Sequence, residues 1–292
     1  MDYWLAQLVR EPGMIRPQCA FLALALVTAA HADTLLILGA VPQEIVPIQE
    51  ALKASSDQTE IEGIPCEHAR LGAHELYVAL TGVGKTNSAM VTAVLICHLH
   101  PKFALMTGTA ARIRRSVRTG DIILATRITF HDMGSLTHDG IVTGKMDANG
   151  KLVDQLWWGP DRQHSTQYGY APDPALLALA SRLATSFVPE RVATQGLDYV
   201  PVVRTGTVVT GDLSGVTDEK IADIRKRLDP DLMEMESASF AQVCSYLHTP
   251  FLVIRSGSNF AEEHNFDDYI RLSPIAARHA ALFTLELVRS LP

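Results

Sequence analysis

The sequence predicts a single α/β domain, and three observations support this fold class. Short apolar runs of strand length alternate with amphipathic helical patterns from about residue 34 to the C-terminus. No internal repeat or linker interrupts the alternation. The composition, 47% hydrophobic and 20% charged over 292 residues, is ordinary for a soluble globular protein with a sizeable core.

The first strand of this domain leads into a candidate functional residue. Residues 34–40 are continuously apolar and end at Gly39-Ala40, as a buried parallel strand does. Pro42 suits the first turn of a following helix, and Glu44 stands just past the carboxyl end of the strand. Open α/β sheets bind ligands at this edge, although acidic residues are also common in first helical turns without any function.

The rest of the chain continues the alternation. Further elements are predicted at residues 60–70 (strand), 75–80 (strand), 86–98 (helix), 103–106 (strand), 121–130 (strand), 176–185 (helix), 202–209 (strand), 221–228 (helix), 251–254 (strand) and 267–291 (helix). The turn Gly82-Val83-Gly84-Lys85, before the first of these helices, imitates a phosphate loop. Ala79 stands where such a loop requires its first glycine, so we expect no nucleotide triphosphate here.

Residues 135–172 are predicted to be an insertion in the domain, because they are polar and rich in Gly and Asp. Asn149-Gly150 favours a tight hairpin turn within it. Trp157-Trp158 is expected to pack onto the domain, with an interface or a lid as the alternative.

The N-terminal residues 1–32 are predicted to comprise upstream residues and a signal peptide. After Met14 and Arg16 comes an apolar run of secretory length, which ends in the A-x-A cleavage pattern Ala30-His31-Ala32. The run is too short to cross a bilayer as a helix, and a buried N-terminal helix is the alternative. We therefore expect residues 33–292 to be exported, periplasmic or secreted, without a stable membrane anchor.

Charge and cysteine usage exclude several classes of protein. The net charge is −7, and the one basic cluster, at residues 112–118, precedes Gly120 as a solvated turn does, so a nucleic-acid partner is not expected. No CxxC motif or Cys/His cluster has metal-ligand spacing, and we predict no metal. Cys97 and Cys244 lie on apolar helical patterns, which predicts that both are buried.

Two carboxylates alternate with two methionines in Met233-Glu234-Met235-Glu236, where an extended segment turns into a helix. Phe240, Val243, Cys244 and Leu247 give that helix its apolar stripe. Alternation sends Glu234 and Glu236 to one face, and Glu236 lies in the first turn, where backbone N–H groups stabilise negative charge. An ordinary helix start with acidic first-turn residues is the alternative.

Several motifs together resemble the nucleoside phosphorylase superfamily, and most closely its methylthioadenosine/S-adenosylhomocysteine nucleosidase branch. The motifs occur in family order from about Leu35 to the C-terminus: Met233–Glu236 before a helix, a buried strand ending in Arg255-Ser256-Gly257-Ser258, and Thr210-Gly211-Asp212 after another strand. The resemblance implies a three-layer α/β/α domain on a mixed, twisted sheet, no cofactor, and a homodimer. It associates His131-Asp132 with the rim of the site, although His131 is also compatible with a purely structural role.

The resemblance also assigns roles to individual residues. It implies that Glu44 activates the attacking water and that Arg255 orients a carboxylate or the nucleophile. Glu236 would bind the ribose 2′ and 3′ hydroxyls. The remaining implied substrate contacts are Met235 under the sugar, Phe266 in the pocket for the 5′-substituent, and Ala40, Thr109, Ala110 and Ser258.

Two positions depart from the relatives. The nucleosidases read Ser-Asp after the last strand and use the aspartate to protonate N7 of adenine, whereas this chain reads Ser258-Asn259. An amide donates a hydrogen bond to N7 but delivers no proton, and it is compatible with a 6-oxopurine. Phosphorylases hold phosphate with an arginine where this chain has Met106, which favours water as the nucleophile, with Arg112 as a possible substitute.

The expected function is hydrolysis of the N-glycosidic bond of a purine nucleoside, giving free base and a ribose moiety, with Glu44, Asn259 and Arg255 as catalytic residues. A phosphate-dependent purine nucleoside phosphorylase is one alternative. A noncatalytic nucleoside-binding or storage-like protein on the same fold is the other.

Overall fold

The structure is a computed structural model that describes residues 33–137, 140–142, 145–146, 152–154, 169–194, 196–214, 216–262 and 266–291. The predicted signal peptide, the turn at Asn149-Gly150 and the pair Trp157-Trp158 lie outside these residues, as does most of the predicted insertion.

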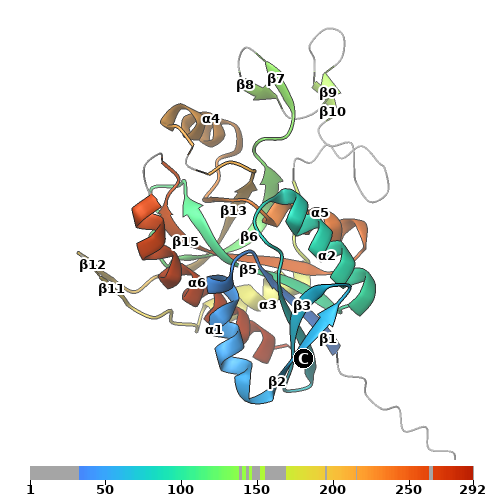
Figure 1. Ribbon diagram of the computed structural model, residues 1–292. Coiled ribbons are helices and arrows are strands. Elements are labelled where there is room, and N and C mark those ends of the chain that lie inside the picture. The colour runs from blue at the N-terminus through green and yellow to red at the C-terminus, as the bar shows by residue number, and fades with distance from the viewer. Residues whose placement is uncertain are drawn as a thin grey trace, which may run out of the picture. The chain divides into compact units, whose positions relative to one another are not determined.

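A nine-stranded mixed sheet forms the centre of the domain (Figure 1), in the order β14-β13-β6-β15-β5-β1-β4-β3-β2. The pairs β1–β4, β1–β5, β5–β15, β6–β13 and β13–β14 are parallel, and the pairs β2–β3, β3–β4 and β6–β15 are antiparallel. The strands are β1 (Asp33–Gly39), β2 (Ser56–Ile61), β3 (Ile64–Leu71), β4 (His74–Leu80), β5 (Phe103–Arg112), β6 (Ile122–Phe130), β13 (Val203–Thr210), β14 (Leu232–Glu234) and β15 (Phe251–Phe260).

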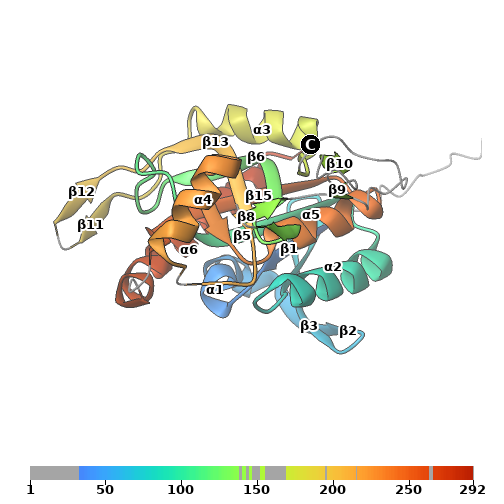
Figure 2. The same ribbon diagram turned by 90° about the horizontal axis from the view of Figure 1, so that it is seen from above.

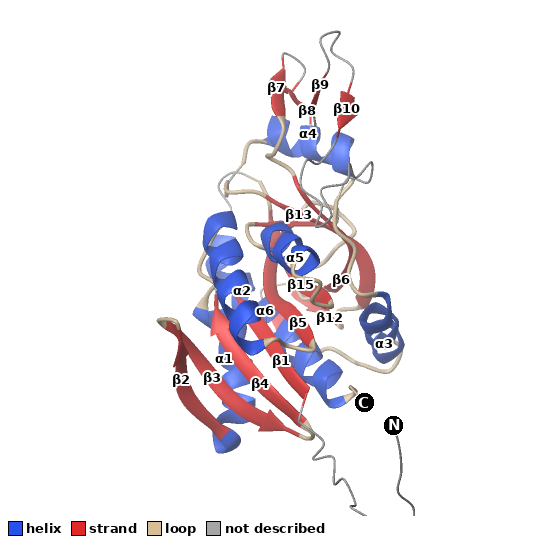
Figure 3. Ribbon diagram, turned by 90° about the vertical axis from the view of Figure 1, so that its right-hand side faces the viewer, coloured by secondary structure: helices blue, strands red, loops and turns tan. Residues whose placement is uncertain are grey.

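Part of this sheet closes into a ring, which the sequence did not indicate. The short strand β14 pairs in parallel with β13 and also antiparallel with β5, where Leu232 lies opposite Arg112 and Met233 opposite Ala111. Strands β14, β13, β6, β15 and β5 therefore form a closed circuit. Figure 3 shows these curved strands continuing into the open sheet of β1, β4, β3 and β2. The closure brings the end of β5 beside the Met-Glu-Met-Glu segment.

Helices cover both faces of the sheet, which confirms the predicted three-layer α/β/α domain. Successive residues of β1 point to opposite faces, so that Leu36 joins the core under α2 and α5, and Leu35 joins the core under α1, α3 and α6. The helices are α1 (Pro42–Leu52), α2 (Lys85–Leu99), α3 (Pro174–Ala184), α4 (Asp218–Leu228), α5 (Ser237–Tyr246) and α6 (Phe266–Arg289), and a 3-10 turn η1 spans Lys53–Ser55. None of the described helices is both long and apolar enough to span a membrane.

Smaller elements complete the domain. Helix α4 packs through Ile221, Ile224 and Leu228 on a third apolar cluster that includes Met233 of β14. The hairpin of β11 (Val192–Thr194) and β12 (Leu197–Tyr199) extends away from the sheet in Figures 1 and 2. Two further hairpins pair β7 (Ser135–Thr137) with β8 (Gly140–Val142) and β9 (Lys145–Met146) with β10 (Leu152–Asp154).

One burial prediction was wrong. Cys244 is buried on α5, as expected, but Cys97 on α2 is exposed. Helix α2 carries apolar residues on more than one side, and Met90, two turns before Cys97 on the same face, is 56% exposed. The apolar pattern of α2 therefore did not identify which of its faces is buried.

Candidate active site

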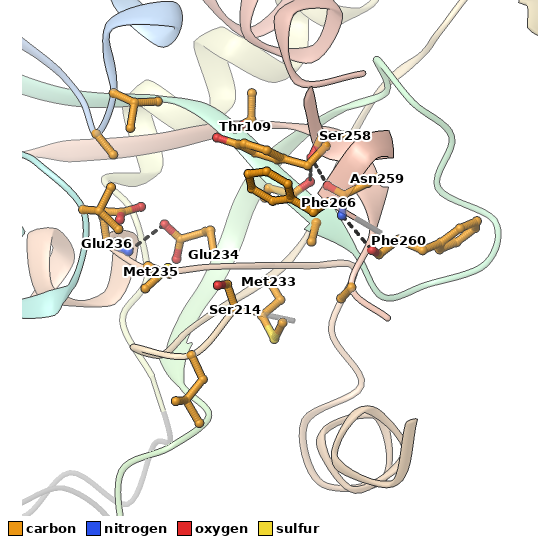
Figure 4. A pocket seen from close by; sticks show the side chains of 18 of the residues that line it. Thr109, Ser214, Met233, Glu234, Met235, Glu236, Ser258, Asn259, Phe260 and Phe266 are labelled. Carbon is orange, nitrogen blue, oxygen red and sulfur yellow. Dashed lines mark hydrogen bonds between the residues drawn. The ribbon is translucent and has the colours of Figure 1, made fainter. Parts of the chain in front are cut away.

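A cavity of about 370 Å³ opens where the carboxyl ends of β5, β14 and β15 meet the first turns of α1 and α6. Figure 4 shows Glu234 and Glu236 at one end of this cavity and Ser258, Asn259 and Phe260 at the other. Its lining residues are Ala40, Val41, Glu44, Val83, Thr109, Ala110, Ala111, Leu213, Ser214, Met233, Glu234, Met235, Glu236, Ser258, Asn259, Phe260, Ala261, Glu262, Phe266 and Tyr269.

The carboxylate of Glu44 is held by hydrogen-bond donors from two segments. Its Oε2 accepts from the backbone N–H groups of Ala40 at 2.7 Å and Val41 at 3.4 Å, which lie at the start of α1. Its Oε1 accepts from the backbone N of Thr109 at 2.7 Å and from the Thr109 hydroxyl at 3.0 Å. The residue is 2% exposed, so α1 and β5 together fix one carboxylate at the wall of the cavity.

Gly108 makes this arrangement possible. Its φ of +148° is unusual for a residue with a side chain, and a Cβ there would stand 2.4 Å from the Glu44 carboxylate and 2.6 Å from Nη1 of Arg255. Both distances are far inside van der Waals contact. The glycine therefore lets the acid and the guanidinium approach the backbone of β5.

Arg255 of β15 lies beneath the cavity and connects three carboxylates. The residue is 0% exposed, and its guanidinium lies 3.5 Å from Glu44 Oε1, 2.5 Å from Glu234 Oε2 and 3.4 Å from Glu236 Oε2. Its Nε donates to the hydroxyl of Ser237 at 3.0 Å. Because buried charges require partners, the single cation stabilises the carboxylates and fixes their relative positions.

Glu234 is the most highly coordinated of these acids. Its Oε2 accepts from the backbone N of Glu236 at 3.0 Å, from the backbone N and hydroxyl of Ser237, both at 2.8 Å, and from Arg255. Its Oε1 accepts from the hydroxyl of Thr210. With five donors on two oxygens, Glu234 ties β13, β14, α5 and β15 together, and its role is structural support for its neighbours.

Glu236 is less coordinated and faces the cavity. Its Oε1 accepts from the backbone N of Gly84 at 2.9 Å. Burial raises the pKa of Glu236 to about 8; the charges of Glu234 and Glu44 act in the same direction, while Arg255 and the Gly84 N–H oppose them. Near neutral pH this carboxyl group is therefore in exchange between its protonated and ionised forms.

Asn259 lies at the opposite end of the cavity with its amide oriented by its neighbours. Its Oδ1 is 3.0 Å from the Ser258 hydroxyl, and its Nδ2 donates to the backbone O of Phe260 at 2.8 Å (Figure 4). The Phe260 carbonyl oxygen would repel the amide oxygen of Asn259, so the amide nitrogen of Asn259 must face it. One N–H of the amide is left to hydrogen-bond a ligand.

Aromatic side chains supply much of the remaining wall. Phe266 and Tyr269, on the first turn of α6, stack with ring centroids 6.1 Å apart, and the Tyr269 hydroxyl accepts from Gln43 at 3.1 Å. Phe260 packs against the guanidinium groups of Arg112 and Arg115, at 3.9 and 4.7 Å from its centroid. No sequence pattern had indicated an aromatic wall at Phe260.

The structure brings the candidate residues together. Ala40, Glu44, Thr109, Ala110, Met235, Glu236, Ser258, Asn259 and Phe266 all line the cavity, and Arg255 lies directly beneath it. Glu234 is the principal residue to which the sequence assigned no role, although its alternation with Glu236 pointed to the same face.

Three other residues considered from the sequence lie outside the cavity lining. Met106 is fully buried in the core. Arg112 donates to the backbone O of Val117 at 3.3 Å and stacks on Phe260, so it does not serve as a phosphate ligand in the cavity. His131 is fully buried under Gly211, and neither ring nitrogen has a hydrogen-bond partner among the described residues. Among the described residues, no group of three or more His, Cys, Asp or Glu side chains is arranged to hold a metal ion.

Comparison with known proteins agrees with this geometry. The family model of the phosphorylase superfamily matches residues 34–289. The 5′-methylthioadenosine/S-adenosylhomocysteine nucleosidase of Geobacillus kaustophilus is 30% identical over 254 residues, which cover 86% of this chain and 95% of that protein.

Solved structures extend the comparison. The nucleosidase of the same name from Neisseria meningitidis, in complex with methylthio-immucillin-A, is 27% identical with a TM-score of 0.70 over 89% of this chain and all of that one. The futalosine hydrolase of Helicobacter pylori, 22% identical with a TM-score of 0.70 over 89% of this chain and 99% of its own, shares the fold.

Proposed function

This chain belongs to the phosphorylase superfamily, and from that premise we propose that it is an N-glycosidase that hydrolyses a purine nucleoside to free base and a ribose moiety. The observation that carries the proposal is the placement of Glu44 and Glu236, which are 192 positions apart in the chain and line one cavity around a shared Arg255. The relatives that match over most of this chain are named as nucleosidases.

The residues have distinct tasks in the reaction. Glu44 accepts a proton from water as the water oxygen bonds to C1′ of the ribose, and the C1′–N9 bond breaks with its electron pair passing to the purine. Ionised Glu236 accepts hydrogen bonds from the ribose hydroxyls, and these strengthen as positive charge develops on the sugar. Met235, beside Glu236, packs against the sugar.

The electrostatics of the cavity favour water over phosphate as the nucleophile. No Lys or Arg is among the described residues that line it, whereas Glu44, Glu234, Glu236 and Glu262 are. Arg255 is already engaged by three of these acids. A doubly charged phosphate would lack the guanidinium or equivalent donors it needs, and the carboxylates would repel it.

Asn259 governs departure of the base in this proposal. Its free amide N–H stabilises the leaving purine through N7 without transferring a proton, so the base leaves as an anion and takes a proton from solvent. This step is expected to be slower for adenine than with a carboxylic acid at the same place, because a general acid contributes about 10²–10⁴-fold.

The central experiment measures release of free base by chromatography. Adenosine, inosine, guanosine, 5′-methylthioadenosine and S-adenosylhomocysteine are incubated with the protein, each with and without phosphate. Phosphate-independent release with free ribose product supports the proposal. Strict phosphate dependence with ribose 1-phosphate as product would establish the phosphorylase, and calorimetric binding without product would establish the noncatalytic alternative.

The variant Asn259→Asp tests the role assigned to the amide. It restores a group able to protonate N7, so we expect release of adenine to rise at least tenfold at pH 6, within the range of general acid catalysis. Asn259→Ala is the matched control and is expected to lower it. An Asn259→Asp variant no faster than the parent would mean that protonation of the base does not limit the reaction.

We further propose that the protein is exported and acts as a homodimer. The N-terminal sequence pattern supports export, and N-terminal sequencing of the protein from a periplasmic extract tests it, with an uncleaved start at Met1 as the contrary result. Exposed apolar side chains on α2, α5 and the cavity rim support a dimer: Val83, Met90, Leu213 and Tyr246 are between 47% and 63% exposed. Light scattering at micromolar concentration distinguishes dimer from monomer.

A further inference from the structure

Two carboxylates from distant parts of the chain accept hydrogen bonds from the backbone N–H groups at the start of α2. The backbone N of Gly84, the residue before the helix, donates to Glu236 Oε1 at 2.9 Å. The next backbone N, that of Lys85, donates to Asp212 Oδ1 at 2.8 Å. Gly84 provides no side-chain cap of its own, so Asp212 caps the helix from outside while Glu236 binds the adjacent N–H.

The side chain of Lys85 completes a closed network at this point. Its Nζ donates to both carboxylate oxygens of Asp132, at 2.8 and 2.9 Å, and lies 3.6 Å from Asp212 Oδ2. The backbone N of Asp212 donates to Asp132 Oδ2 at 2.9 Å. Burial alone would raise the pKa of Asp132, but the hydrogen bonds from Lys85 and Asp212 outweigh this effect. The net pKa of Asp132 is lowered, so the network holds an ionised carboxylate.

Gly84 is the link between this network and the cavity. It has a φ of +97°, and a Cβ on it would stand 3.2 Å from Asp212 Oδ1, so the Asp212 carboxylate lies directly against it. The residues after Asp212, Leu213 and Ser214, line the cavity themselves. A shift of the Asp212 carboxylate therefore reaches both the N–H that binds Glu236 and one wall of the cavity.

We propose that Lys85 is a positioning residue for Glu236: by neutralising Asp132 and Asp212 it holds the first turn of α2 so that the Gly84 N–H points at the Glu236 carboxylate. The proposal rests on the proposed function in taking Glu236 as the ribose-binding group. Lys85 itself does not line the cavity and is not a catalytic residue.

Removal of Lys85 is expected to raise the pKa of Glu236. The charged groups that face Glu236 are Glu44 from α1, Glu234 from β14 and Arg255 from β15, and a change at Lys85 leaves all three in place. Loosening of the Gly84 hydrogen bond disfavours the ionised form of Glu236, because this N–H lowers the pKa of the carboxyl group. The titration midpoint of Glu236 should therefore move upward, by about one pH unit.

The experiment compares Lys85→Met with Lys85→Arg and with a matched control, Lys102→Met. Like Lys85, Lys102 forms an ion pair with an aspartate, Asp33 at 2.5 Å, and lies over a phenylalanine ring, at 5.5 Å against 5.7 Å for Lys85. The titration of Glu236 is followed by ¹³C-carboxyl NMR, with its resonance assigned by its loss in Glu236→Gln. Lys85→Met should show the raised midpoint, Lys85→Arg should restore it, and Lys102→Met should leave it unchanged.

Kinetics provide a second readout with a pH signature. A midpoint raised from about 8 to about 9 lowers kcat/KM about 9-fold at pH 7 but less than 2-fold at pH 9.5, where Glu236 is ionised in both proteins. A substitution that only destabilises the fold would not bring the kcat/KM values of variant and parent together at high pH. Should Lys85→Met fail to fold, Lys85→Gln, which keeps a donor for Asp132, takes its place.

The outcomes separate the two proposals. An unmoved Glu236 midpoint in Lys85→Met overturns the positioning role, as does a loss of kcat/KM that is equal at every pH. A parent protein that releases no base from any nucleoside overturns the proposed function, while the NMR titration still decides the role of Lys85.

Discussion

The variant Gly108→Ala tests the packing on which the candidate active site depends. The added Cβ would stand 2.4 Å from Cδ and Oε1 of Glu44, so the carboxylate must retreat by about 1 Å to reach ordinary contact. That movement breaks its hydrogen bonds from the backbone N and hydroxyl of Thr109, now 2.7 and 3.0 Å long. Arg255, with Nη1 2.6 Å from the same Cβ, blocks one route of retreat.

The expected magnitudes follow from these contacts. Hydrogen bonds to a charged group are worth about 1.5–3 kcal/mol each, and an unfavourable backbone conformation costs about 1–3 kcal/mol. Allowing for relaxation, we expect the free energy of unfolding to fall by about 4 kcal/mol. A catalytic group misplaced by about 1 Å lowers kcat/KM about 100-fold.

Gly72→Ala is the matched control. Gly72 also has a positive φ, +63°, but nothing lies within 4 Å of the position of its Cβ. It should lose only about 1 kcal/mol to backbone strain and keep full activity. Chemical denaturation and base-release kinetics measure both variants. If Gly108→Ala matched Gly72→Ala in stability and in kcat/KM, the inference that Glu44 is fixed against β5 would be wrong.

Three further expectations concern the buried charges. Because the pKa of Glu236 is about 8, its ionised fraction and kcat/KM should rise about 50-fold from pH 6 to pH 8, a rise that Glu236→Gln should lack. A profile that is flat above pH 6 would contradict a requirement for ionisation of Glu236 with this raised pKa. The raised pKa also means that the contribution of Glu236 to stability, full below about pH 4, is lost as pH rises through about 8, which thermal denaturation across pH measures. Arg255→Met leaves three buried acids uncompensated and should lower the free energy of unfolding by about 3–5 kcal/mol, whereas Arg278→Met, at a half-exposed pair with Glu190, should change it by less than about 1 kcal/mol; equal losses in the two variants would contradict the assigned role of Arg255.

Most secondary structure could be predicted from the sequence because its signals are local. The continuous apolar run of β1 and the apolar stripe of α5 give a strand and a helix directly. The pairing of β14 with β5 could not be predicted in this way. Strand β14 has three residues, too few for a periodicity, and its second partner is decided by long-range packing.

In the candidate site, too, the residues with local sequence signals could be predicted and those placed by long-range packing could not. Glu44 and Glu236 could be named because each stands at a recognisable junction of strand and helix and because family motifs surround them. The support given by Glu234 could not be predicted, since its five donors come from β13, from the start of α5 and from β15. The aromatic wall at Phe260 depends on how the end of β15 packs against Arg112, at the end of β5, and against Arg115, just after it. No local sequence pattern reports this contact.

The closed circuit of β14, β13, β6, β15 and β5 has a consequence for self-association. Because β14 is paired on both sides, the main sheet has one edge strand among the described residues, and this strand is β2. Strand β2 reads Ser-Asp-Gln-Thr-Glu-Ile, and its middle residues are exposed. Acidic side chains such as Asp57 and Glu60 repel the same strand of a second copy. They therefore disfavour edge-to-edge pairing of two molecules through β2.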